Sequence, residues 1–86
     1  MEWNKERTQK SEHQTLSIHT PYITLGQLLK RAGVIDTGGA AKQYLADNEV
    51  LVNGEREVRR GRKLFPGDTV AAGSRQWLIT RENTRE

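Results

Sequence analysis

Residues 38–54 read GGAAKQYLADNEVLVNG, and this stretch changes its hydrophobic period in the middle. The apolar residues of its first half have the i, i+3, i+4 spacing of one helix face: Ala41, Tyr44 and Leu45. A short β-prone run at 50–52 then ends at Asn53-Gly54, the dipeptide that suits a type I′ hairpin turn because both central residues need a positive φ. Asn48 lies where the helix must end, so we expect a left-handed C-cap there. The stretch therefore predicts helix, break, strand and hairpin turn.

The residues before this stretch predict another short helix. Thr24 and Gln27 fit a capping box. An amphipathic stripe follows: Leu25, Leu28, Leu29 and Ala32. We expect Gly33 to end this helix, and Asp36 or Thr37 to cap the next one, with Gly38-Gly39 in its first turn. Two short helices joined by a tight turn make a helix-turn-helix-like unit.

Strands are expected on both sides of the two helices. A polar–apolar alternation at 15–20 predicts an edge strand that ends at Pro21, because proline cannot donate to a ladder. Pro66-Gly67 is typical of a type II turn, and two further strands are expected at 69–72 and 76–80. The prediction is one α+β domain over 14–80, with a flexible arm at 1–13 and a flexible tail at 81–86.

Composition limits the class of protein. The chain has 86 residues, which favours a single domain, and it has no cysteine for a disulfide or a thiolate metal site. No apolar run approaches the roughly 20 residues of a membrane span, and the N-terminus lacks the apolar region of a signal peptide. These features lead us to expect a cytoplasmic protein. A pI of about 9.6 permits a nucleic-acid partner.

The positive charge is concentrated in one segment. Residues 56–63 contain one acid, Glu57, and five bases: Arg56, Arg59, Arg60, Arg62 and Lys63. The net charge of this segment exceeds the +3 of the whole chain. Arginine presents a planar fork of donors that suits phosphate oxygens, so the segment is a candidate for binding RNA, the alternative being a solvated loop. Lys30, Arg31 and Lys42 on the predicted helices are further candidates.

Other polar and aromatic residues receive simpler interpretations. Tyr44 and Trp77 are expected in the core, and Asp68 is expected to hydrogen-bond nearby backbone. His13 and His19 have no partners at metal-ligand spacing. Nothing forms a catalytic constellation, so we expect no catalytic residue, no metal and no cofactor.

An ordered set of residues resembles a known family. The set comprises Leu25-x-x-Leu28-Leu29, Thr37, Ala41-x-x-Tyr44-Leu45, Val50-x-Val52-Asn53-Gly54 and Leu64-x-Pro66-Gly67-Asp68-x-Val70. It resembles the small RNA-binding domain named after ribosomal protein S4, and most closely its stand-alone bacterial form, the YaaA type. The resemblance implies an S4-like (αL) fold, in which a two-helix unit packs on a small, mostly antiparallel sheet.

The resemblance also implies where RNA would bind, with two departures from the family pattern. Gly38 stands where the family often has arginine, and Asn48 where it usually has glycine. Backbone N–H groups of Gly38-Gly39 could still receive a phosphate. The expected RNA-binding residues are Lys30, Arg31, Thr37, Gly38, Gly39, Lys42, Arg56, Arg59, Arg60, Arg62 and Lys63.

The sequence therefore predicts a non-enzymatic, monomeric RNA-binding protein. The expected partner is structured ribosomal RNA or a ribosomal precursor particle, with no membrane and no small-molecule substrate. Two alternatives remain open at this point. One is a β-grasp-like module that docks an acidic protein, and the other is a helix-turn-helix DNA binder.

Overall fold

The structure, a computed structural model, describes residues 12–82. Its elements in chain order are β1 (Glu12–Ile18), β2 (Ile23–Thr24), α1 (Leu25–Arg31), α2 (Ala40–Asp47), β3 (Val50–Val52), β4 (Glu55–Arg56), β5 (Lys63–Leu64), β6 (Thr69–Ala72) and β7 (Arg75–Arg81). Most of the predicted arm and tail lies outside the described residues. The first strand begins earlier than the predicted 15–20 and ends before Pro21.

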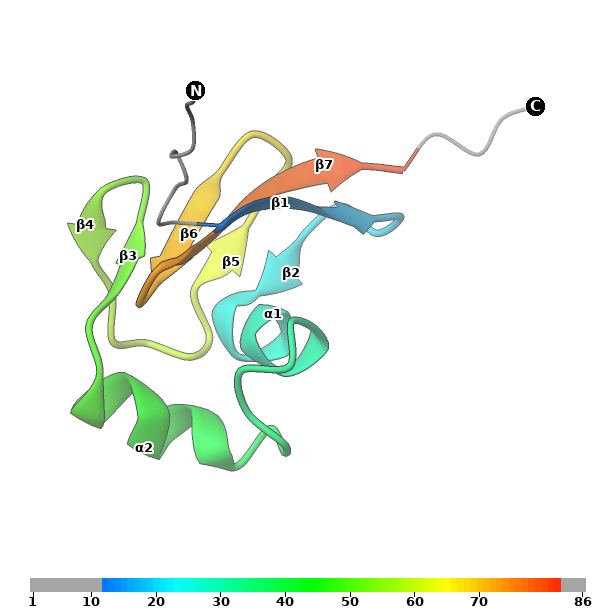
Figure 1. The fold of residues 1–86 in the computed structure, drawn as a ribbon. Coiled ribbons are helices and arrows are strands. Elements are labelled where there is room, and N and C mark those ends of the chain that lie inside the picture. The colour runs from blue at the N-terminus through cyan, green and yellow to red at the C-terminus, as the bar shows by residue number, and fades with distance from the viewer. Residues whose placement is uncertain (1–11, 83–86) are drawn as a thin grey trace, which may run out of the picture.

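The seven strands form two sheets. The larger has the order β1-β7-β6-β3-β4, and β2 pairs with β5 in the smaller (Figure 1). All pairs are antiparallel except β1 with β7, which run parallel with Glu12 opposite Arg75 and Ile18 opposite Arg81. The predicted edge position of β1 and the mostly antiparallel sheet are confirmed.

The core lies between the larger sheet and the two helices, which Figure 1 shows on the same side of that sheet. The predicted stripe of α1 is buried at its three leucines, and α2 buries Ala41 and Leu45. Trp77 is buried on β7, as expected, and Tyr44 packs against the edge of the core. The flanking strands contribute Leu16, Ile18, Val50, Val52, Leu64, Val70, Ala72 and Ile79.

Of the four predictions for the helix ends, two are correct and two are wrong. Gly33 follows the C-cap of α1 with φ 80°, as expected for a helix end. Thr24 caps α1, and the reciprocal bonds of the capping box are present at 2.9 and 3.3 Å. In α2 the N-cap is Gly39, without a side-chain bond, so the prediction of Asp36 or Thr37 is wrong. The reason is a turn that precedes the helix, in which the Ala40 N–H donates to the Thr37 carbonyl at 3.1 Å.

The left-handed C-cap predicted at Asn48 is also wrong, because its backbone is extended, with φ −131°. Both its N–H and its side-chain Nδ2 donate to the Tyr44 carbonyl, at 2.9 and 3.1 Å. The side chain thus closes the helix end, and the chain can continue directly toward β3.

The hairpin turn between β3 and β4 matches its prediction. Asn53 has φ 53° and Gly54 has φ 86°, as a type I′ turn requires. The Asn53 side chain also connects this turn to the Pro66-Gly67 turn. Its Nδ2 donates to Asp68 Oδ1 at 3.1 Å, and its Oδ1 accepts from the Thr69 N–H at 2.9 Å. Asp68 itself accepts from the Phe65 N–H at 2.8 Å, as expected.

Candidate nucleic-acid interface

The charged segment at 56–63, here called the basic loop, is fastened to the start of α1. The N–H groups of Leu25 and Gly26 donate to the carbonyls of Arg62 and Arg60, each at 2.9 Å. These N–H groups belong to the first helical turn and have no partner inside the helix. The β2–β5 ladder adds a second attachment, since Thr24 lies opposite Lys63. The basic loop is therefore held in one position.

Gly26 marks the point where the basic loop and both helices meet. A Cβ atom on Gly26 would lie 3.4 Å from the Cβ and carbonyl oxygen of Arg60, and 3.5 Å from the Cβ of Ala41 on α2. A methyl group would just make van der Waals contact on both sides, and a larger side chain would not fit. The sequence placed this glycine in the helix without indicating the close approach.

Inside the basic loop, Glu57 is buried, with 7% of its surface exposed. Its Oε2 accepts from the N–H groups of Val58 and Arg59, both at 3.0 Å. Its two oxygens also accept from Arg59 Nε at 3.0 Å, Arg59 Nη2 at 3.1 Å and Arg62 Nη1 at 2.8 Å. One carboxylate thus binds the turn of the loop and two of its arginines.

These contacts fix the charge state of Glu57. The hydrogen bonds from the Arg59 side chain and N–H, followed by that from Arg62, hold the pKa of Glu57 well below its usual range, although burial acts in the opposite direction. The same carboxylate raises the pKa of Arg59. Glu57 is therefore an anion at neutral pH and offsets part of the charge that the sequence assigned to the loop.

The predicted RNA-binding residues of the basic loop fall into two groups. Arg59 and Arg62 are paired with Glu57. Within residues 12–82, no carboxylate forms an ion pair with Arg56, Arg60 or Lys63, all of which are exposed. The amino-acid sequence did not predict this division. The signal for it was a single acid between arginines, but the pairing depends on the shape of the loop.

The remaining predicted residues lie on the helices and their connection. Lys30 and Arg31 are exposed in the last turn of α1, and Arg31 Nη2 donates to the Ser17 carbonyl of β1 at 3.0 Å. Lys42 is exposed on α2. Thr37, Gly38 and Gly39 form the exposed turn before α2, and the Gly38 carbonyl accepts from the Ala41 N–H at 3.2 Å.

Other charged side chains have structural roles. Arg75 lies over the Trp77 ring at 4.8 Å and donates to the Ala32 carbonyl at 3.1 Å, which connects β7 to the end of α1. His19 Nδ1 lies 3.6 Å from Glu82 Oε1.

Within residues 12–82, no three histidine, aspartate or glutamate side chains gather as metal ligands would. No helix in this part of the chain is long and apolar enough to cross a membrane.

Comparison with known families agrees with this architecture. The model of the S4 domain matches residues 16–80, so the chain belongs to the S4 domain family, and the predicted S4-like α+β fold is confirmed. A protein of Bacillus subtilis named "Probable ribosome maturation protein RlbA" is 60% identical over 55 residues, which are 64% of this chain and 78% of the relative. One of Escherichia coli named "Putative RNA-binding protein YbcJ" is 37% identical over 51 residues, 59% of this chain and 73% of the relative.

Proposed function

We propose that this protein binds structured RNA without catalysing a reaction, and that its partner is ribosomal RNA or a ribosomal precursor particle during maturation. The observation that carries the proposal is the basic loop, whose backbone is fastened to α1 and whose arginines are held by Glu57. The printed names of the two relatives, one for ribosome maturation and one for RNA binding, support the same function. The protein would act as a cytoplasmic monomer.

The proposed mechanism is neutralisation of phosphates by a rigid set of cations. Arg56, Arg60 and Lys63 are exposed and bind phosphates directly. Arg59 keeps 72% of its side chain exposed beside Glu57, so its outer edge contacts RNA as well. Because Glu57 already orders the loop, little conformational entropy is lost on binding. Arg62 supports the loop from within.

The helices extend this surface. Lys30 and Arg31 from α1, Lys42 from α2 and the exposed turn at 37–39 flank the RNA, and the turn offers backbone N–H groups to a phosphate. Recognition depends on the shape of the RNA more than on its base edges, because the deep, narrow major groove of A-form RNA hides most of the base code.

Salt dependence of binding tests the mechanism. If about four phosphates are bound, the logarithm of the affinity for a ribosomal RNA fragment should fall with the logarithm of salt concentration with a slope of about −3. The triple variant Arg56→Glu, Arg60→Glu, Lys63→Glu should lose binding and should no longer co-sediment with ribosomal particles. Arg81→Glu, an exposed cation on β7, is the matched control. A flat salt dependence, or co-sedimentation of the folded triple variant, would contradict the proposal.

Two further measurements separate the competing functions. Duplex DNA should compete poorly against ribosomal RNA, whereas equal competition would indicate a helix-turn-helix DNA binder. Capture of the same protein partner before and after ribonuclease treatment would instead indicate a module that docks an acidic protein.

A further inference from the structure

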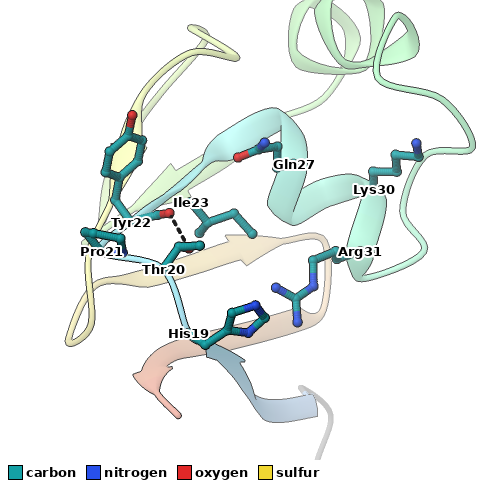
Figure 2. A pocket seen from close by; sticks show the side chains of 8 residues that line it. All are labelled: His19, Thr20, Pro21, Tyr22, Ile23, Gln27, Lys30 and Arg31. Carbon is teal, nitrogen blue, oxygen red and sulfur yellow. Dashed lines mark hydrogen bonds between the residues drawn. The ribbon is translucent and has the colours of Figure 1, made fainter.

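A groove beside α1 lies outside the basic loop and is not used by the phosphate contacts of the loop. It has a volume of about 730 Å³ and is lined by the connection from β1 to β2 and by one face of α1 (Figure 2). The lining residues include His19, Pro21, Tyr22, Gln27, Lys30 and Arg31. None of them is acidic, and a volume of this order is in the range of small-ligand sites.

An aromatic pair joins this groove to the basic loop. Tyr22, which is 39% exposed, and Phe65, which is 48% exposed, have ring centroids 5.8 Å apart. The ammonium group of Lys63 lies 5.0 Å from the centroid of the Tyr22 ring. Exposed rings next to cations form the kind of surface on which unpaired bases stack, because every base has a π face.

The hydrogen bonds of Gln27 determine what the groove offers to a ligand. Its side-chain oxygen accepts from the Thr24 N–H at 2.9 Å in the capping box, so the amide NH₂ is the group left for a ligand. Figure 2 shows this side chain on α1, with Tyr22 and Pro21 across from it, and His19 and Arg31 also line the groove. The groove thus combines an aromatic ring, a hydrogen-bond donor and cations.

We propose that this groove binds one unpaired nucleotide of the RNA whose neighbouring phosphates are held by the basic loop. The base stacks on Tyr22 and accepts a hydrogen bond from Gln27, while Lys63 on one side and Arg31 on the other attract the adjacent phosphates. This inference rests on the proposed function, and it adds that the preferred RNA is a helix interrupted by a bulge or ending in an overhang.

The test compares two RNAs that share one stem, one fully paired and one with a single unpaired nucleotide. The protein should bind the bulged RNA roughly ten-fold more tightly, from the usual contribution of one base–aromatic stack. Tyr22→Ala should abolish this preference, whereas Tyr22→Phe, which keeps the ring beside Lys63, should keep it. Leu78→Ala, an equally exposed apolar residue on β7, is the control and should change neither affinity.

A second variant removes the donor and keeps the helix cap. Gln27→Glu retains an oxygen for the capping box, so α1 should remain folded by circular dichroism while the preference for the bulged RNA falls. The loss should be larger for the bulged than for the paired RNA. An equal loss for both would show only the added negative charge and would count against a base in the groove.

The remaining outcomes of these experiments would contradict either the nucleotide site or the proposed function. If the protein binds both RNAs equally, or Tyr22→Ala weakens both to the same extent, the groove does not hold a nucleotide, although the proposed function stands. If neither RNA binds, the proposed function itself fails. If free AMP shifts the NMR resonances of Tyr22 and the bulge confers no preference, the ligand is a free nucleotide, which also overturns the inference.

Discussion

Glu57 is the residue on which the shape of the basic loop depends. Replacing it with glutamine keeps the volume and removes the charge, so the bonds to Arg59 and Arg62 weaken. We expect Glu57→Gln to lower the free energy of unfolding at pH 7 by about 1–3 kcal/mol, the usual effect of impairing a buried hydrogen-bonded group. Urea denaturation measures this, and Glu55→Gln, an exposed acid on β4, should have little effect.

The same carboxylate should make stability depend on pH. The pKa of Glu57 is lower in the folded protein than in the unfolded chain, where it is about 4.5. Its contribution is therefore present above pH 4–5 and is lost as the pH falls further. Denaturation between about pH 2 and pH 6 should show a smaller pH dependence for Glu57→Gln than for the wild type. Parallel curves for the two proteins would show that Glu57 is not the group responsible.

Asn53 performs two tasks that one substitution can separate. Asn53→Gly retains the positive φ of the hairpin turn and removes the side-chain bonds with Asp68 and Thr69. We expect a loss of about 1–2 kcal/mol in the free energy of unfolding, although the hairpin itself still forms. If denaturation curves of the variant and wild type coincide, the link between the two turns does not stabilise the fold.

At the scale of elements, the junction of α1, α2 and the basic loop admits a methyl group and nothing larger. Gly26→Ala should therefore be tolerated in both stability and RNA affinity. Gly26→Val should push the basic loop away from α1, because the branches of valine would meet Arg60 and Ala41. RNA binding should therefore weaken, while the larger sheet remains intact. Heteronuclear NMR of both variants, with RNA titrations, checks this. Equal RNA affinity for the two variants would mean that the junction does not set the position of the loop.

The elements also show what the sequence could predict. Both helices and the strands β1, β3, β6 and β7 followed from local sequence patterns, and the turn at Asn53-Gly54 followed from its dihedral requirements. The two-residue strands β2 and β5 were not predicted, because they depend on pairing with each other. The predicted cap of α2 was wrong because a turn precedes the helix, and the predicted left-handed end at Asn48 was wrong because its side chain closes the helix while its backbone is extended. The charge of the basic loop was predictable by counting. Its division into paired and exposed cations was not, since that depends on how residues 57 and 62 approach each other.

At the scale of the molecule, binding of RNA should stabilise the folded state by mass action. A ribosomal RNA fragment at about 100 times its dissociation constant should add about 2.7 kcal/mol to the free energy of unfolding. Calorimetry should show a higher midpoint temperature with RNA, and the shift should shrink as salt is added. An increase that persists at high salt would point to contacts other than phosphates.

The parallel pairing of β1 with β7 has a consequence for synthesis on the ribosome. Seven residues near the start of the chain find their partners only in the last strand, with Glu12 opposite Arg75. While the chain grows, Leu16 and Ile18 must wait for translation to pass residue 81 before they can be buried. The larger sheet is therefore completed only when β1 pairs with β7, although β1 is synthesised long before β7. A nascent chain stalled before β7 leaves β1 without its partner.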